Sequence, residues 1–244
     1  ERMLRIYFLQ QWYALADEAL EDAIYDSQAM RDFVGIDLAI ESVPDATTLL
    51  RFRHLLEKHA LTQRIFQEIN AHLAEKGLFM REGTIVDATI VSAAPSTKNK
   101  AKQRDPEMKQ TRKGNQWYFG MKAHIGVDAV TGLTHTVVAT SANVADVTMV
   151  EHLVRDDDNR VHADAGYIGM GKRLDEEKDA RNSRCCIAAK RGGIKKMEES
   201  PMKELLLKIE RTKASIRAKV EHPFHVIKNL FGYRKVRHKG LAKN

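Results

Sequence analysis

The repeat of apolar residues along the chain switches from helical to strand-like near Gly83. Before this point, stretches such as "LRIYFLQQWYALADEALEDAIYD" (residues 4–26) place apolar side chains near helical spacing. After it, "TIVDATIVSA" (residues 84–93) is rich in the β-branched residues that favour strands. Because the two repeats belong to different kinds of structure, the sequence predicts two domains, over residues 1–80 and 81–244.

Local signals subdivide the first domain into helices. Gly35 and Pro44 interrupt the helical repeat, and Asp45 is placed to cap the helix that follows. Gly77 is placed to end a further helix that begins near Thr62. The sequence therefore predicts a small all-α domain of three helices.

Charge is distributed unevenly between the two domains, within a net charge of +7. Residues 1–80 hold 8 Lys and Arg against 13 Asp and Glu, whereas residues 81–244 hold 32 against 20. A basic second domain indicates a polyanionic partner, of which nucleic acid is the commonest. Two interpretations of the acidic first domain stay open: a DNA-binding domain in which Arg51, Arg53 and Lys58 form a basic face, or a packing domain.

The second domain alternates strands and helices. After its first strand, "YFGMKAHIGVDAVTGLTHTVVATSAN" predicts two strands joined by a turn in which Gly132 supplies the permissive backbone. Three helical segments then alternate with two short strands, and Ser200 and Pro201 mark the start of the last, long helix. This order predicts an α/β fold, in which helices flank a mixed sheet.

A polar stretch, residues 94–118, interrupts the strands of the second domain. A loop of this length is usually functional or disordered, so a DNA-binding loop and a solvated flexible loop both stay open. Trp117 and Tyr118 either stack on bases or begin the next strand. Basic residues outnumber Asp105 and Glu107 in this stretch. These basic residues are Lys98, Lys100, Lys102, Arg104, Lys109, Arg112 and Lys113.

Two aspartates occupy positions where a carboxylate needs a physical reason. Asp87 lies within the apolar strand "TIVDATIV", where a carboxylate is costly unless it is paired or bound to a metal. Asp164 ends the short strand "VHAD", and strand ends are where α/β proteins place their sites. The alternative for Asp164 is an ordinary turn-forming residue.

A third acid lies in the long helix, in "RAKVEHPFHVIKNLFGYRKVR" (residues 217–237). Arg217, Glu221 and Lys228 run along the edge of the face that we expect to pack on the sheet. An ion pair between Arg217 and Glu221 would not explain Pro223, which bends or breaks a helix and thereby aims Glu221 or redirects the basic segment that follows. The apolar stripe expected to be buried consists of Leu206, Ile209, Ile216, Val220 and Ile227.

Three carboxylates from two strands and a helix suit phosphodiester chemistry with two divalent metal ions. Magnesium (Mg²⁺) prefers oxygen ligands and keeps several waters. One ion activates the attacking water or 3′-hydroxyl, and the other stabilises the leaving oxygen. The basic loop would hold a DNA backbone beside this site, together with the basic C-terminal stretch over residues 228–244, which includes Arg234, Lys235 and Arg237.

The spacing Arg-x₃-Glu-x₆-Lys, carried by Arg217, Glu221 and Lys228, resembles the signature of bacterial insertion-sequence DDE transposases, in particular the family numbered five. The blocks "TIVDATIVSAAPS", "KGNQWYFGMKAHIGVD", "TSANVADV" and "ADAGYIG" are similar to other blocks of that family and occur in the right order. The resemblance extends over nearly the whole chain. One position departs from it, because the signature has a tyrosine where this chain has Ala214.

The resemblance implies a ribonuclease-H-like fold from about residue 81, and an acid triad of Asp87, Asp164 and Glu221 that binds two Mg²⁺ or Mn²⁺ ions. It implies cleavage of DNA at the ends of a mobile element and strand transfer into target DNA, with Arg217 and Lys228 near the cut. The expected partners are terminal inverted repeats, target DNA and a second copy of the chain on paired ends. The alternatives are a nuclease on the same fold and a non-catalytic DNA-binding derivative.

The histidines bear on which residues bind metal, and the cysteines and hydropathy bear on where the protein works. His124 and His162 are expected on the site's side of their strands, as core or supporting residues rather than metal ligands.

Cys185 and Cys186 are adjacent and have no partner elsewhere in the sequence, which predicts no disulfide and fits a reducing cytoplasm. No apolar run approaches the ~20 residues of a membrane span, so we expect a cytoplasmic, nucleoid-associated protein. The chain starts at Glu1 rather than methionine, which leaves an upstream segment open.

Overall fold

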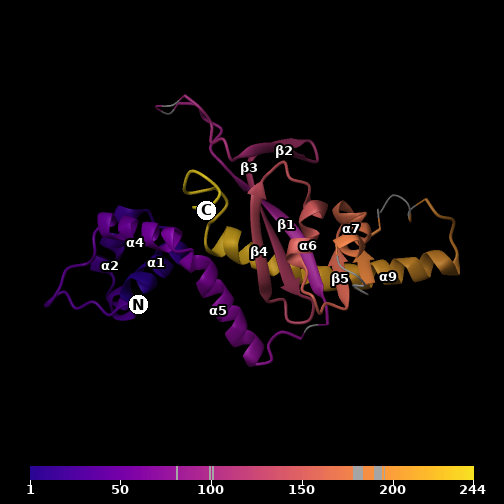
Figure 1. Ribbon diagram of the computed structural model, residues 1–244, viewed down its shortest axis with the longest axis horizontal. Coiled ribbons are helices and arrows are strands. Elements are labelled where there is room, and N and C mark those ends of the chain that lie inside the picture. The colour runs from indigo at the N-terminus through magenta and orange to yellow at the C-terminus, as the bar shows by residue number, and fades with distance from the viewer. Residues whose placement is uncertain (81, 99, 101, 178–183, 190–193, 195) are drawn as a thin grey trace. The chain divides into compact units, whose positions relative to one another are not determined.

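The computed structural model describes residues 1–244 except 81, 99, 101, 178–183, 190–193 and 195. The chain divides into two compact units (Figure 1). The helical unit comprises Glu1–Ala71 and Val226–Arg234, and the sheet unit comprises His72–His225 and Lys235–Asn244. The chain thus returns to the helical unit for a short segment before it ends in the sheet unit. The predicted functional domains, residues 1–80 and 81–244, stay a prediction.

The first 75 residues, all of which the structure describes, form more helices than the sequence predicted. The expectation of three helices is wrong, because Ala14 adopts a left-handed conformation that ends the first helix. Ser27 and Asp45 cap two later helices by accepting hydrogen bonds from the N–H groups of Met30 and Thr48. The helices are α1 (Arg2–Tyr13), α2 (Asp17–Asp26), α3 (Gln28–Val34), α4 (Ala46–Lys58) and α5 (Leu61–Glu75).

Arg53 is buried inside the helical unit, so the predicted basic face of Arg51, Arg53 and Lys58 is wrong for its central residue. The Arg53 guanidinium donates to both carboxylate oxygens of Asp17, at 2.5 and 2.6 Å, and to the Gln10 side chain at 3.3 Å. The hydrogen bond to Asp17 raises the pKa of Arg53 above its ordinary value. The apolar core beside this cluster consists of Ile6, Leu9, Leu20, Ile24, Val34, Ile36, Val43 and Leu49.

The sheet unit is built on a mixed sheet, which has six strands among the described residues. β1 pairs antiparallel with β3 and parallel with β5, and β5 pairs parallel with β6. β2 and β4 both pair with β3, and the remaining order is β3-β1-β5-β6. The strands are β1 (Thr84–Ser92), β2 (Lys109–Lys113), β3 (Gln116–Asp128), β4 (Thr134–Ser141), β5 (Arg160–Ala163) and β6 (Arg184–Ile187). The α/β prediction is confirmed, and this arrangement fits the ribonuclease-H-like fold that the resemblance implied.

The predicted loop over residues 94–118 is wrong in its second half, where β2 and the start of β3 form a hairpin through Gly114. All side chains of β2 except the partly buried Thr111 are exposed, so no apolar alternation marked it in the sequence. Trp117 and Tyr118 belong to β3. Trp117 is 64% exposed, which excludes it from the core.

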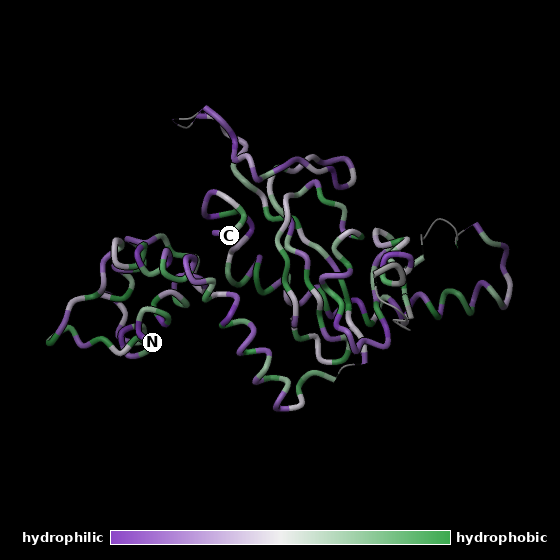
Figure 2. Tube along the Cα trace, viewed as in Figure 1, coloured by the Kyte–Doolittle hydropathy of each residue, from purple (hydrophilic) through white to green (hydrophobic). Residues whose placement is uncertain are grey.

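Helices cover both faces of the sheet. On one face, Val86 and Val161 pack against Leu153 and Met170, within a cluster completed by Val150, Val154, Ala163, Tyr167 and Leu174. On the other face, Ile85, Ile125 and Val127 pack against Val220 and Phe224. Figure 2 shows this apolar character as green along the strands. The elements on the first face are η1 (Asp146–Met149), α6 (Val150–Leu153), η2 (Ala165–Tyr167) and α7 (Met170–Glu177).

The long helix begins where the sequence predicted but is less buried than expected. Ser200 caps α9 (Pro201–Arg217) by accepting a hydrogen bond from Lys203 N–H at 3.3 Å. α9 has no buried residue, and Ile209 is 41% exposed, so the expected stripe packs on the sheet only near its end, at Ile216 and Val220. Within the part of the chain that the structure describes, no helix is both long and apolar enough to cross a membrane.

The helix changes type around Pro223. α9 ends at Arg217 and is followed by η3 (Ala218–Val220), α10 (Glu221–His225) and the π-helical turn η4 (Val226–Leu230). Pro223 therefore lies in the first turn of α10, where a missing N–H costs little. The predicted break is confirmed, and it makes Glu221 the first residue of a new short helix.

A buried ionic network ties the segment after α6 to the end of β3. The Arg155 guanidinium lies 3.2 Å from Asp128 and 2.9 Å from Asp158, and neither carboxylate is exposed. Asp128 also accepts hydrogen bonds from the N–H groups of Met80, Val130 and Thr131. Because both carboxylates are compensated, this network is structural.

Candidate active site

Asp87 and Asp164 are brought to the same level by the pairing of two parallel strands. In that pairing Thr84 lies opposite Val161, and Ile85 lies opposite His162. The same offset places Asp87 opposite Asp164, just past the end of β5. Neighbouring strands lie about 4.8 Å apart, so the two aspartates are neighbours in space although 76 residues separate them in the sequence.

Asp164 is held by the turn that follows its strand. Its Oδ1 accepts a hydrogen bond from Gly166 N–H at 2.7 Å and caps η2. A Cβ atom at Gly166 would lie 2.9 Å from this oxygen, so a larger residue there would displace the Asp164 carboxylate. The capping role and a role in chemistry are compatible, because the second oxygen of Asp164 is not used by this bond.

Glu221 lies on the side of the sheet to which Asp87 points. Successive side chains of a strand point to opposite faces, so Asp87 shares a face with Ile85. Ile85 packs against Val220 and Phe224, the residues on either side of the start of α10. Glu221 is exposed at this point. The fold therefore collects the three predicted acids on one side of the sheet.

The electrostatics of Asp87 reflect this gathering of charge. The pKa of Asp87 is raised from 3.8 to about 6, chiefly by burial; the hydrogen bond from Ala88 N–H opposes this rise, and the charge of Asp164 contributes to it. Arg217 lowers this pKa, and Glu221 raises it. The Arg217 guanidinium lies 3.9 Å from Asp87 Oδ2, at the outer limit of an ion pair. The site thus concentrates negative charge that a single arginine compensates in part.

This donor set fits a hard divalent cation in its chemistry. Mg²⁺ binds carboxylate oxygens and retains water, which suits two half-buried aspartates beside an exposed glutamate. Among the described residues, no three His, Cys, Asp or Glu side chains lie close enough together to hold an ion. The acids therefore interact through their charges without forming a closed set of ligands, and their assignment as metal ligands stays a prediction.

Tyr167, which no sequence pattern marked, belongs to the core on the other face of the sheet, where the charges of the acids still act on it. The residue is 1% exposed, and within the described part of the chain its hydroxyl has no hydrogen-bond partner. Burial raises its pKa above the ordinary value, and the charges of Asp146, Asp87 and Asp164 add to this effect. The block "ADAGYIG" contains Tyr167, but nothing in its sequence marks the hydroxyl as buried.

The two histidines lie on opposite faces of the sheet. His124 pairs with Ala88, so it points away from the face of Asp87, and the expectation that it shares the site's side is wrong. Its Nε2 contacts Thr140 Oγ1 at 2.8 Å, and burial lowers its pKa to about 4. His162 pairs with Ile85 and does lie on the face of Asp87, where burial lowers its pKa. Burial therefore favours the neutral form of both histidines.

Apart from Arg217, which lies 3.9 Å from Asp87, the predicted DNA-binding residues fall into three groups. Most lie on the sheet unit, on the stretch before β2 or on β2 itself, and all of these are exposed: Lys98, Lys100, Lys102, Arg104, Lys109, Arg112 and Lys113. Lys235 and Arg237 lie on the final segment of the sheet unit. Lys228 and Arg234 lie in the segment that belongs to the helical unit. Their contacts with DNA stay a prediction.

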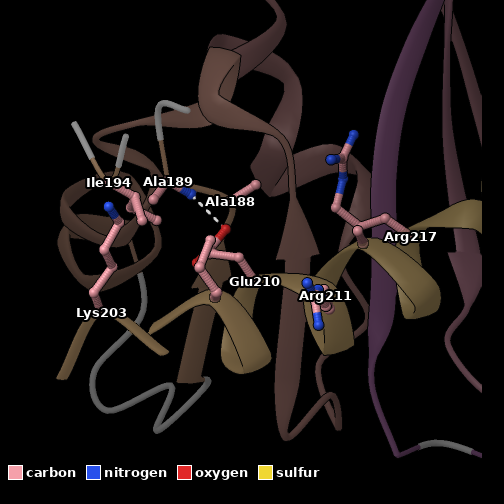
Figure 3. A pocket seen from close by; sticks show the side chains of 9 residues that line it. Ala188, Ala189, Ile194, Lys203, Glu210, Arg211 and Arg217 are labelled. Atoms are coloured by element: carbon pink, nitrogen blue, oxygen red, sulfur yellow. Dashed lines mark hydrogen bonds between the residues drawn. The ribbon is translucent and has the colours of Figure 1, made fainter. Parts of the chain in front are cut away.

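A pocket of about 450 Å³ runs along α9 and reaches Arg217 (Figure 3). Arg211 and Arg217 project from α9, and Glu210 on the same helix accepts a hydrogen bond from Ala189 N–H at 2.9 Å. Ala214 lines this pocket at the position where the signature has a tyrosine. The small side chain of Ala214 leaves the pocket open beside Arg217.

Family comparisons agree with this geometry. Residues 78–244 match the family described as "Transposase DDE domain". Residues 1–55 match the family described as "Transposase domain (DUF772)". Among solved structures, none matches the chain significantly. The first match spans Asp87, Asp164 and Glu221.

Proposed function

Because this chain belongs to the DDE transposases, we propose that Asp87, Asp164 and Glu221 are the residues with which it cuts and joins DNA. The observation that carries this proposal is the pairing offset that puts Asp87 opposite Asp164, on the face against which the start of α10 packs. Divalent metal ions, which this family generally uses, would be held by these carboxylates and would make a water or a 3′-hydroxyl more acidic while offsetting phosphate charge.

The three acids differ in how firmly the fold holds them. Asp87 lies within β1 and accepts a hydrogen bond from Ala88 N–H at 2.7 Å. Asp164 is fixed by its turn, whereas Glu221 is exposed at the start of a five-residue helix. Two rigid carboxylates and one adjustable carboxylate suit a site that closes when its ligands bind.

Arg217 is placed to serve both the acids and the DNA. Its Nη2 lies 3.9 Å from Asp87, and its Nε is buried and has no hydrogen-bond partner among the described residues. The Arg217 side chain is 22% exposed, and a guanidinium binds a phosphate oxygen well, because the hydrogen bond is charge-assisted. Arg217 therefore orients the phosphate at the cut and balances Asp87.

The remaining basic residues would position DNA through its phosphates. We assign this role to the exposed lysines and arginines of residues 98–113 and to Lys235 and Arg237, with Lys228 and Arg234 contacting DNA from the helical unit. Residues 1–80 would read the terminal inverted repeats, as a domain distinct from the catalytic residues 81–244. A second copy of the chain would hold the paired end.

Cleavage of DNA that carries the sequences flanking this gene tests the proposal. We expect nicked and joined products that require Mg²⁺ or Mn²⁺. Glu221→Gln should lower the cleavage rate by at least about a hundredfold while DNA affinity stays within about twofold, since a metal-site carboxylate acts in the chemical step. Glu204→Gln on α9, also an exposed glutamate, is the matched control and should keep full activity.

The products separate the alternatives. Cut DNA without joined DNA indicates a nuclease on the same fold. Binding without any metal-dependent turnover indicates a non-catalytic derivative. Unchanged cleavage by Glu221→Gln would refute the assignment of the third acid.

A further inference from the structure

Backbone hydrogen bonds attach the final segment of the chain, residues 235–244, to β1 in the sheet unit. Lys235 forms an isolated parallel bridge with Ser92, the last residue of β1. The N–H of Val236 donates to the carbonyl oxygen of Ser92 at 2.9 Å. The segment, which we call the tail, therefore starts from the strand that carries Asp87.

Two acidic residues of the otherwise basic stretch before β2 hold the other end of the tail. Asp105 Oδ2 accepts a hydrogen bond from Gly240 N–H at 2.7 Å, and Glu107 Oε2 accepts one from Leu241 N–H. Gly240 has a φ of +88°, and a Cβ there would lie 3.3 Å from Glu107 Oε2, so this approach favours glycine. Asp105 and Glu107 are the only acids among residues 94–118, and both accept hydrogen bonds from main-chain N–H groups of the tail.

The tail also closes on itself. The side chain of Asn244 accepts hydrogen bonds from Arg237 N–H at 2.9 Å and His238 N–H at 3.1 Å. It donates to the carbonyl oxygens of His238 at 2.7 Å and Gly240 at 2.6 Å. The tail is therefore a compact turn fixed at several points.

Between the tail and the stretch that follows β1 lies a cleft of about 450 Å³. Its polar lining includes Ser96, Lys100, Asp105, Arg237, His238 and Lys239. Three of these side chains are cationic, and the one carboxylate is already bonded to the tail. A basic cleft with hydroxyl and N–H donors suits the phosphates of a nucleic acid backbone.

We infer that this cleft binds the DNA backbone. Asp105 and Glu107 strengthen this binding because they anchor the tail, which forms one wall of the cleft. The inference rests on the proposed function and adds a role for two acids that charge alone would predict to repel DNA. Charges within a Debye length of about 10 Å act on each other, so an acid in the wall of a cleft that binds phosphates would weaken binding unless it also has a structural role.

Two double variants with the same change in charge test the inference in the full-length chain. Asp105→Asn with Glu107→Gln removes both charges but keeps an oxygen acceptor at each position. Asp105→Ala with Glu107→Ala removes the same charges and both acceptors. A fluorescent DNA duplex of arbitrary sequence is the probe, titrated at several salt concentrations.

We expect the amide variant to bind the duplex as tightly as the unmodified chain or more tightly. The alanine variant should bind about five- to tenfold more weakly, and the slope of its log affinity against log salt should fall by about 0.9 for each phosphate that it no longer neutralises. Hydrogen exchange should show faster exchange at Gly240 and Leu241 N–H in the alanine variant alone. Equal binding by the two variants, or unchanged exchange at these N–H groups, would overturn the inference.

The test separates this inference from the proposed function. Loss of the anchor lowers DNA affinity and leaves the cleavage rate of bound DNA unchanged. Glu221→Gln leaves DNA affinity nearly unchanged and lowers the cleavage rate. A chain that binds no duplex in any form would overturn both.

Discussion

Replacement of Asp87 by asparagine should make the metal-free protein more stable at neutral pH while it abolishes DNA cleavage. Asp87 is 18% exposed in its side chain, and its pKa is raised from 3.8 to about 6, chiefly by burial. A pKa raised on folding means that the folded chain holds the proton more tightly than the unfolded chain. The charged form of Asp87 therefore opposes folding.

The magnitude follows from the size of the shift. Each pKa unit corresponds to about 1.36 kcal/mol, so a rise from 3.8 to about 6 corresponds to roughly 3 kcal/mol of lost stability once Asp87 is ionised. This loss is absent below pH 3.8, where the carboxyl is protonated in both states. It grows between pH 3.8 and about pH 6 and is complete above that range. Asparagine cannot ionise and keeps an oxygen for the Ala88 N–H.

Urea unfolding across this pH range, with a metal chelator present, measures the difference. Asp87→Asn and the unmodified chain should have equal free energies of unfolding near pH 3.5. Near pH 8, the free energy of unfolding of the variant should be higher by about 2–3 kcal/mol. Glu204→Gln, at an exposed position, is the control and should show no such gap.

Addition of millimolar Mg²⁺ should then stabilise the unmodified chain and leave Asp87→Asn nearly unchanged, because a ligand that binds only the folded state adds stability by mass action. A variant that is less stable than the unmodified chain near pH 8 without metal would refute the reasoning about burial. Equal stabilisation of both proteins by Mg²⁺ would refute Asp87 as a metal ligand.

Two further substitutions test the scaffold behind the site. Arg155→Met should lower the free energy of unfolding by about 3–5 kcal/mol, because it leaves the buried carboxylates of Asp128 and Asp158 uncompensated, and a loss below about 1 kcal/mol in urea would contradict this. Gly120→Ala should destabilise by about 3 kcal/mol, because its Cβ would lie 2.1 Å from a carbonyl oxygen of β1. Gly171→Ala in α7 is the control for the glycine test: its Cβ meets only ordinary contacts, so thermal unfolding should show equal or greater stability, by up to about 1 kcal/mol.

Sequence patterns predicted those parts of the fold whose signals are local. β1, the β3–β4 hairpin and the cap of α9 follow from β-branched runs, a turn glycine and a Ser-Pro pair. The break near Pro223 is local as well. By contrast, Ala14 ends α1 in a left-handed conformation that alanine rarely adopts, so no residue type announced it.

The remaining differences depend on contacts between distant residues. The sequence could not show that Arg53 would turn inward, because its partner Asp17 lies 36 residues away and only packing brings them together. The side of the sheet on which His124 points depends on its register with Ala88. The placement of Asp87 opposite Asp164 likewise depends on register, although each residue alone was a candidate.

The return of the chain to its first unit has a consequence for synthesis. Residues 1–71 leave the ribosome long before residues 226–234, which complete the same compact body. At about 5–20 residues per second, that interval lasts roughly 10–30 seconds. The helical unit is therefore completed only once residues 226–234 have been made, and a chain released before that point would lack part of both units.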